Sequence, residues 1–387
     1  MELSDSDAAA ARVRSAVAAI AAGRAVVVAD NVDRKNEGDL IFAASLATPA
    51  LVAFMVRHTS GFVGVAVADD DCDRLGLVPM SRDKRNRYQT AYQVTLDVRD
   101  NGTGISAAAR AATIAALGSP GSRATDFTRP GHVVPVRARP GGVLARPGHT
   151  EAAVDLARLA GLPAAGALST VVSQDHLGEM ARGAELERFA EKHSLPLISV
   201  AELAQYRRRI EPQVHRVVET TLPTALGRFT AYGYRGAADE AEYLALTAGP
   251  VGADTPVQVH IECVAGDVLQ STGCDCRREL EDALRVFAAR RSGVIIYLRL
   301  PSSLGACVLE QWSDGQPEAA YWVAEWMAAD LGVNRPQHSP SLEGRTYMVR
   351  DNGSDGGRYV TRPRTQSAPA DALSASRLDE LLRECSS

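Results

Sequence analysis

Three of the six cysteines lie close together in the sequence and could bind a metal ion. Cys263, Cys274 and Cys276 follow the pattern C-x10-C-x-C. Three thiolates leave the fourth tetrahedral position of Zn²⁺ to water, which is the arrangement of a catalytic zinc site. The alternative is three buried cysteines without a ligand. Because such a cluster suits a reducing compartment better than a disulfide framework does, the spacing favours zinc.

The tetrapeptide Arg-Pro-Gly-His occurs twice, at Arg129–His132 and at Arg146–His149. The second copy precedes apolar residues at helical spacing that end at Gly161, and we expect Thr150 to be the N-cap of this helix. A helix N-terminus offers unpaired N–H groups and a partial positive charge, so this turn suits an anionic substrate or a metal-bound oxygen. The alternative is that both histidines are turn residues bonded to backbone.

Two further polar segments occupy positions where functional residues are common. One follows a predicted strand, and the other precedes a predicted helix. The loop DRKNEGD (Asp33–Asp39) follows the apolar run Ala25–Asp30, which we interpret as a buried strand. Thr103 precedes an alanine-rich helix and would place its hydroxyl near a helix N-terminus. The alternative for Asp33–Asp39 is a solvated turn.

The elements that must position these residues alternate along the chain. Helical patterns precede Gly23 and cover Ala184–Lys192, and strand patterns cover Thr90–Val98 and Ala165–Asp175. A new pattern begins near Arg207–Pro212. At 387 residues the chain is long enough for two domains with separate cores.

The composition excludes several classes of protein. Charged residues make up 23% and hydrophobic residues 45%, and the net charge is −5. This balance provides no basic surface for nucleic acid, which we do not expect as a partner. No apolar run reaches the length of a membrane span, and the N-terminus does not follow a signal-peptide pattern. We expect no membrane partner and a cytoplasmic location.

The N-terminal motifs together resemble 3,4-dihydroxy-2-butanone 4-phosphate synthase, which supplies the four-carbon unit of riboflavin. The resemblance covers about residues 10–208. It is carried by these segments: DRKNEGDLIFAA, MVRHTSG, TGISAA, RPGHVVPVRARPGGVLARPGHTEAAVDLARLAG and LPLISVAELAQYR. The segment HIECVAGDVLQSTGCDCRRELEDAL (His260–Leu284) resembles GTP cyclohydrolase II, which is often fused behind the synthase.

The resemblance implies a fold and a domain order. It implies an α+β domain over residues 1–208 and an α/β domain over residues 209–336. Residues 337–387 contain turn and linker sequences and are expected to form a flexible tail. The synthase family works as a homodimer with its sites near the interface, so we expect self-association.

The resemblance also implies roles for individual residues. In the synthase the Asp33–Asp39 loop binds the sugar phosphate and Mg²⁺. The implied catalytic residues are His132, Lys35 and Glu37, His149 is the implied Mg²⁺ ligand, and the cysteine triad is the implied Zn²⁺ site. The implied substrate-binding residues are Arg34, Asp39, Thr103, Arg146, His149 and Thr150.

Two working carboxylates of the synthase family are replaced in this chain. Lys35 stands at the position of a glutamate that binds the metal, and an ammonium repels a divalent cation. Thr170 stands at the position of a glutamate that moves protons, which a hydroxyl cannot do at neutral pH. Lys35 could instead form a Schiff base with a ketone, polarise a carbonyl, or point away from the site.

The second domain departs further from its family. Gln258 and Gly273 stand where the family has arginines. Counting back from Ala329–Val333, Pro317 and Ala319 occupy the positions of an aspartate base and an arginine nucleophile. Proline has no ionisable group and alanine no nucleophile, so we expect GTP cyclohydrolase II activity to be lost.

Three functions remain open at this point. The first is conversion of ribulose 5-phosphate to 3,4-dihydroxy-2-butanone 4-phosphate and formate. The second is a related lyase or isomerase reaction on another phosphorylated sugar, with Lys35 in place of a metal ligand. The third is a non-catalytic paralogue that binds an active riboflavin enzyme. We expect the first, with a phosphorylated sugar as substrate.

Overall fold

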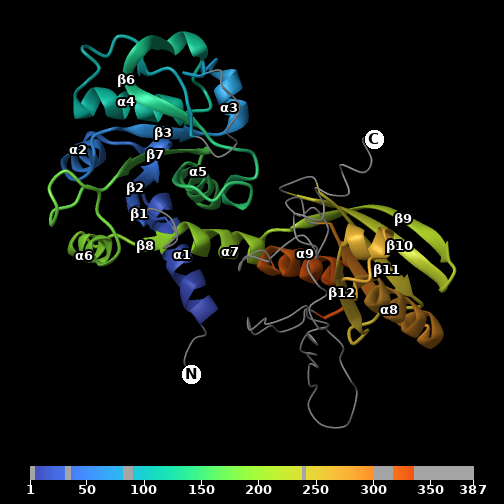
Figure 1. Ribbon diagram of the computed structural model, residues 1–387. Coiled ribbons are helices and arrows are strands. Elements are labelled where there is room, and N and C mark those ends of the chain that lie inside the picture. Colours follow the sequence, from blue (N-terminus) through green and yellow to red (C-terminus); the bar gives the residue numbers. More distant parts are fainter. Residues whose placement is uncertain (1–4, 31–35, 82–89, 238–240, 300–316, 335–387) are drawn as a thin grey trace, which may run out of the picture. The chain divides into compact units, whose positions relative to one another are not determined.

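A computed structural model of the chain describes residues 5–30, 36–81, 90–237, 241–299 and 317–334. The chain divides into two compact units, Met1–Glu211 and Pro212–Ser387 (Figure 1). The division falls three residues beyond the predicted limit at 208. Each unit has its own sheet and its own core. The predicted tail, residues 337–387, lies outside the described residues.

The first unit is built on a mixed sheet with the strand order β4-β6-β3-β7-β2-β1-β8, in which β5 also pairs with β6. The pairs β1–β8 and β3–β6 are parallel, and the other pairs are antiparallel. The strands are β1 (Val26–Ala29), β2 (Gly38–Ala43), β3 (Gly64–Val67), β4 (Ala91–Tyr92), β5 (Leu96–Val98), β6 (Phe127–Arg137), β7 (Ala165–Thr170) and β8 (Leu197–Ser199).

Helices cover both faces of this sheet. Leu40 and Phe42 of β2 join one core with α2, α4 and α6, whereas Ile41 and Ala43 join the other with α1, α5 and α7. Because alternate strand residues point to opposite faces, a central strand covered on both sides is buried throughout. The helices are α1 (Asp5–Ala21), α2 (Pro49–His58), α3 (Asp69–Arg74), α4 (Ala107–Leu117), α5 (His149–Leu159), α6 (Ala184–Lys192) and α7 (Val200–Ile210).

Three local predictions for the first unit need correction. The strand predicted over Ala165–Asp175 ends at Thr170. Helix α5 begins at His149 with Gly148 as its N-cap, so Thr150 lies inside the first turn and is buried instead of capping. A Cβ at position 148 would lie 2.8 Å from Arg146 Nη1, and glycine is an accepted cap residue. The strand predicted over Thr90–Val98 is interrupted, and only its two ends form β4 and β5.

The second unit contains a smaller sheet of order β12-β13-β11-β10-β9, and among its described residues one helix packs on each face. Ile295 packs with Phe287 of α8, and its neighbours in β13 pack with Met327 of α9. Among the described strand pairs of this unit, only β12–β13 is parallel. The elements are β9 (Val214–Thr224), β10 (Gly227–Gly236), β11 (Glu242–Ala248), β12 (Val257–Ile261), α8 (Cys276–Arg290), β13 (Gly293–Leu298) and α9 (Pro317–Asp330).

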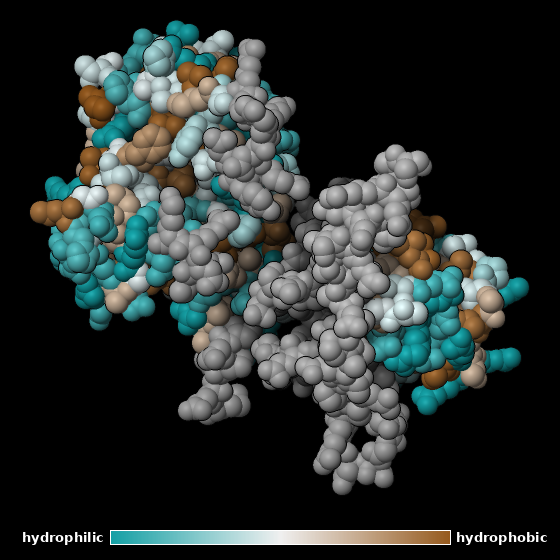
Figure 2. All heavy atoms as spheres, viewed as in Figure 1, coloured by the Kyte–Doolittle hydropathy of each residue, from teal (hydrophilic) through white to brown (hydrophobic). Residues whose placement is uncertain are grey.

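The predicted order of an α+β unit followed by an α/β unit is confirmed by these elements. Figure 2 shows, from one side, that hydrophilic and hydrophobic residues are intermixed on the described surface of both units. Among the described helices, none combines the length and the apolar character needed to cross a bilayer.

Candidate active site and candidate metal centre

A buried carboxylate and an imidazole meet where β2 begins and α5 starts. Asp39 lies in β2 directly opposite Thr170 of β7, and its Oδ2 is 3.7 Å from His149 Nδ1. Asp39 Oδ1 and His149 Nε2 are buried and have no hydrogen-bond partner among the described residues. Buried polar atoms are nearly always satisfied, so an unpaired buried atom on each of two neighbouring side chains indicates a place for a ligand.

The start of α5 adds positive character to the same place. Arg146 Nη1 donates a hydrogen bond of 2.6 Å to Glu151 Oε2, and both side chains are largely buried. His149 and Thr150 form the first turn of α5, where backbone N–H groups are unpaired within the helix. A fixed guanidinium beside a helix N-terminus is suited to a phosphate group.

The Asp33–Asp39 loop is described only from Asn36 onward. Glu37 pairs across an isolated bridge with Arg182, and Arg182 Nη2 lies 3.0 Å from Glu37 Oε1. Glu37 is therefore held against the segment that follows β7. Arg34 and Lys35 lie outside the described residues, so their predicted roles remain predictions.

His132 is held by a carboxylate that the sequence did not single out. Its Nδ1 lies 2.6 Å from Asp97 Oδ2, and its backbone N–H donates to Asp97 Oδ1 at 3.0 Å. These two hydrogen bonds leave His132 Nε2 as the ring nitrogen that does not contact the carboxylate. The His132 side chain is 40% exposed. Gly104 passes so close to Asp97 that a Cβ would lie 2.1 Å from its oxygen. Thr103 is exposed beside it.

The structure does not bring all predicted site residues of the first unit together. The Asp39 cluster consists of Asp39, Arg146, His149, Thr150 and Thr170. The His132 cluster consists of Asp97, Thr103, Gly104 and His132. The strand of His132, β6, is separated from β2 by β3 and β7. At ~4.8 Å between neighbouring strands, the two backbones are about 14 Å apart within one chain.

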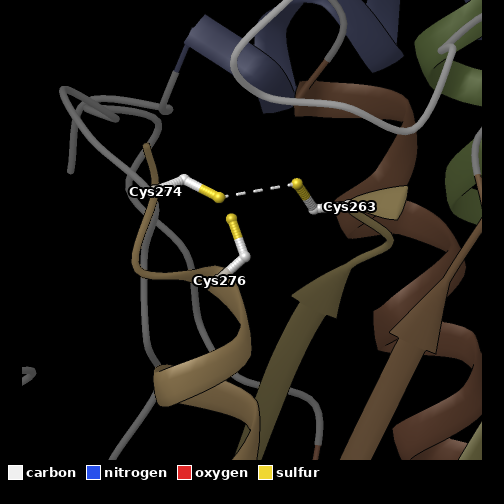
Figure 3. A group of neighbouring side chains, drawn as sticks. All are labelled: Cys263, Cys274 and Cys276. Atoms are coloured by element: carbon white, nitrogen blue, oxygen red, sulfur yellow. Dashed lines mark hydrogen bonds between the residues drawn. The ribbon is translucent and has the colours of Figure 1, made fainter. Parts of the chain in front are cut away.

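The three clustered cysteines converge in the second unit. The Sγ atoms of Cys263, Cys274 and Cys276 lie within 4.8 Å of one another, and the first two are 3.9 Å apart (Figure 3). Tetrahedral Zn²⁺ with Zn–S bonds near 2.3 Å requires sulfurs about 3.8 Å apart. The donor set therefore fits zinc. Gly266 N–H points to Cys263 Sγ at 3.3 Å, an orientation that supports a thiolate.

A buried carboxylate beneath the cysteines organises this centre. Asp267 Oδ2 accepts hydrogen bonds from Cys263 N at 2.8 Å, from His260 Nε2 at 3.0 Å and from the Tyr297 hydroxyl at 2.9 Å. Burial raises the pKa of Asp267, but these hydrogen bonds outweigh it and hold that pKa below its ordinary value. Sequence reasoning missed Asp97 because its partner, His132, is 35 residues away. It also missed Asp267, although the short spacing to Cys263 and His260 was a signal that could have found it.

The residues that depart from the cyclohydrolase pattern lie at different places in this unit. Gln258 is buried in β12, two residues before His260, and its Nε2 has no hydrogen-bond partner among the described residues. Gly273 is exposed. Pro317 is the first residue of α9, and Ala319 follows in its first turn.

Comparison with known proteins identifies both units. Residues 14–206 match the family model of 3,4-dihydroxy-2-butanone 4-phosphate synthase, and residues 215–316 match that of GTP cyclohydrolase II. The riboflavin biosynthesis protein RibBA of Rhodococcus erythropolis is 54% identical over 372 residues, which cover 88% of each chain. The protein of the same name from Mycobacterium tuberculosis is 52% identical over 294 residues, covering 74% of this chain and 69% of its own.

A solved structure spans both units. It is RibBX of A. baumannii, described as a two-domain 3,4-dihydroxy-2-butanone 4-phosphate synthase, with a TM-score of 0.68 and 35% identity over 83% of this chain and 91% of its own. The fold and the sites thus define a two-domain enzyme of the synthase–cyclohydrolase type. The chain belongs to the family of bifunctional riboflavin biosynthesis proteins.

Proposed function

We propose that the first unit converts ribulose 5-phosphate to 3,4-dihydroxy-2-butanone 4-phosphate and formate, and that the second unit no longer opens the ring of GTP. The observation that supports the proposed synthase activity is the Asp39 cluster. There, a buried carboxylate and a partly buried imidazole, each with one buried polar atom that has no partner among the described residues, lie beside the N-terminus of α5. This arrangement supports binding of a small, anionic, hydroxyl-bearing substrate.

Each residue of the Asp39 cluster has a distinct task in this proposal. Arg146 and the first-turn N–H groups of α5 hold the phosphate. Asp39 Oδ1 accepts a hydrogen bond from a substrate hydroxyl, which would satisfy an atom left without a partner among the described residues. Thr170, opposite Asp39, adds only a hydroxyl. Proton transfer is therefore slower than with a carboxylate at that position.

Mg²⁺ is the metal that the synthase resemblance implies. His149 Nε2 is buried without a partner among the described residues and can supply one ligand, with substrate and water oxygens supplying others. The site fits a weakly held ion, because Lys35 offers no oxygen ligand. When bound, the ion polarises the substrate carbonyl.

We further propose that the complete site forms between two copies of this chain. The His132 cluster lies about 14 Å from Asp39 within one chain, since three strand spacings separate β6 from β2. A second copy could place His132 Nε2 nearer to a substrate beside Asp39 than this separation within one chain does. A homodimer would thus bring the two clusters together.

An exposed apolar patch supports self-association. Phe62, Val78, Met80 and Tyr92 are each between 41% and 54% exposed. The rings of Phe62 and Tyr92 are 5.8 Å apart, and Met80 N–H donates to the Tyr92 carbonyl. Tyr92 belongs to β4, which pairs with the strand that carries His132. Contiguous apolar surface of this kind marks an interaction site.

The proposed loss of cyclohydrolase activity in the second unit is inferred from the residues that stand at the family's expected catalytic and binding positions. Pro317 and Ala319 supply neither a base nor a nucleophile, and Gln258 replaces a cationic contact with a neutral one. RibBX of A. baumannii, which is similar to this chain across both units, is described by the synthase activity alone. We propose that zinc at Cys263, Cys274 and Cys276 stabilises this unit.

One observation favours a second candidate function. Thr170 faces Asp39 directly, so the replaced glutamate belonged inside the Asp39 cluster and its loss changes the chemistry there. A phosphorylated sugar could then undergo a simpler lyase or isomerase reaction with Lys35 acting on the carbonyl. Borohydride trapping with substrate followed by peptide mapping tests this candidate, and an unmodified Lys35 contradicts it.

The proposed function is tested by following ribulose 5-phosphate with ¹³C NMR, with and without Mg²⁺. The wild type is expected to release formate, and the Asp39→Asn and His149→Ala variants are expected to lose that activity. Consumption without formate supports the second candidate. An unchanged substrate together with tight binding to an active riboflavin enzyme supports a non-catalytic paralogue instead.

A further inference from the structure

The substrate loop, residues 138–148, connects β6 to α5 and contains Arg146. Two buried acidic residues of α5, Glu151 and Asp155, face this loop. They are four residues apart, so they lie on the same side of the helix in successive turns, and each side chain is 1% exposed. Glu151 accepts hydrogen bonds from Arg139 N at 3.1 Å and from Arg146 Nη1 at 2.6 Å. Asp155 accepts one from Val143 N at 2.8 Å. The two carboxylates therefore hold the loop at three points.

Arg207 of α7 reaches the same loop from the other side. Its Nη1 donates to Asp155 Oδ2 at 2.7 Å and to the carbonyl of Gly141 at 2.9 Å. Its Nε and Nη2 donate to the two oxygens of Glu211 at 2.8 and 2.6 Å. One guanidinium thus ties the loop, helix α5 and the last residue of the first unit together.

The backbone of the loop is shaped to admit these groups. Gly142 has φ +62°, and a Cβ there would lie 2.1 Å from an Asp155 oxygen and 2.5 Å from Arg207 Nη1. Only glycine combines this conformation with so close an approach. Gly141 is also left-handed, with φ +87°. The turn and the Asp155–Arg207 pair therefore fit each other as one unit.

We propose that Asp155 and Arg207 are positioning residues for binding of the phosphorylated sugar. They fix Gly141 and Val143, and through this turn they set the direction in which Arg146 enters the site. Neither residue touches the substrate. The inference rests on the proposed function, because it assumes that the loop binds a sugar phosphate.

Stability alone does not explain this pair. Taking two charges out of water costs about as much as their attraction returns, so a buried ion pair is often replaced by apolar residues without loss of stability. Burial raises the pKa of Asp155 against the opposing effect of Arg207 and the Val143 N–H. Asp155 Oδ1 also has no hydrogen-bond partner among the described residues. These features agree with a pair kept for geometry.

The test compares stability with substrate affinity in the full-length chain. The double variant Asp155→Leu/Arg207→Met removes both charges and keeps similar volumes. We expect it to melt within a few degrees of the wild type, yet to bind ribulose 5-phosphate at least about tenfold more weakly in calorimetry. Arg12→Met is the matched control, because Arg12 pairs with Glu202 of α7 away from the loop. It is expected to leave the affinity unchanged.

A double-mutant cycle with Arg146 shows whether the loss of substrate affinity is transmitted through the Arg146 side chain. Arg146→Gln should weaken binding less in the double variant than in the wild type, since coupled residues are not additive. If the double variant does not fold, Arg207→Lys serves instead, with unchanged melting and an intermediate affinity expected. Wild-type affinity in either folded variant overturns the inference. Absence of binding by the wild type contradicts the proposed function itself.

Discussion

Asp39 and Thr170 lie directly opposite each other in the antiparallel β2–β7 pair. Cross-strand neighbours have Cβ atoms about 5 Å apart, so a longer acidic side chain at position 170 would reach the same substrate atoms as Asp39. In the proposed site, Thr170 therefore stands at the centre, at the position where the synthase family is expected to have a proton-carrying glutamate.

Restoring this carboxylate should raise the rate. Thr170→Glu is expected to increase formate release from ribulose 5-phosphate by ~100-fold or more, the usual contribution of a positioned acid–base group. Lys35→Glu in the same chain should add tighter Mg²⁺ binding. Thr170→Gln, which has the same shape but no acidic proton, is the control. Equal rates for the glutamate and glutamine variants would refute this role.

Sharing of the site between two chains predicts complementation. His132→Ala and His149→Ala should each abolish activity alone. In a mixed population, half of the dimers are heterodimers with one intact site, so activity returns to about a quarter of the wild-type value. The measurement is formate release after co-refolding or subunit exchange. Mixtures that stay inactive would show that each chain builds its own site.

Asp267 should control metal affinity in the second unit. Asp267→Asn weakens the hydrogen bonds that hold Cys263, His260 and Tyr297, and a loss of roughly 10–100-fold in Zn²⁺ affinity is expected. Competition with a chromophoric chelator measures it. Asp282→Asn, on the exposed surface of α8, is the matched control. Unchanged affinity in Asp267→Asn would remove Asp267 from the metal centre.

A histidine pair predicts a pH dependence of stability in the first unit. The rings of His58 and His193 lie 4.8 Å apart among Phe54 and Phe189. Burial, the neighbouring His193 and the charges of Arg57 and Lys192 lower the pKa of His58, while burial and Lys192 lower that of His193. Both imidazoles are therefore favoured in the neutral form.

The direction of this pH dependence follows from proton linkage. The contribution of the two neutral imidazoles to stability is present above the unfolded pKa near 6.5. It is lost as the pH falls through their lowered pKa values in the folded state. Thermal melting should therefore occur at lower temperature at pH 5.5 than at pH 7.5, and His193→Gln should reduce that difference. His176→Gln, in the exposed loop after β7, should leave it intact. An unchanged pH dependence in His193→Gln would contradict the assignment.

Periodic segments of the sequence predicted much of the fold. The helix predicted over Ala184–Lys192 has those bounds in the structure, and Gly161 is left-handed where a helix was predicted to end. Local patterns were sufficient there, because apolar spacing and glycine act within a few residues. The cap of this helix was not predicted correctly, because Gly148 is the N-cap and Thr150 lies one residue inside the first turn.

Side-chain partners distant in sequence could not be predicted. Asp97 holds His132 from 35 residues away, and Arg207 holds Asp155 from 52 residues away. Strand order and helix packing determine such contacts, and spacing in the sequence carries no trace of them. The cysteine triad was predictable because its chemistry requires a compact motif, and the structure brings the three sulfurs together.

The most direct test is mass spectrometry of the products formed by the purified chain from ribulose 5-phosphate and, in parallel, from GTP, each with Mg²⁺ and Zn²⁺ present. We expect 3,4-dihydroxy-2-butanone 4-phosphate and formate from the first substrate and unchanged GTP from the second. A ring-opened product from GTP would contradict the assignment of the second unit, and an untouched pentulose phosphate would contradict that of the first.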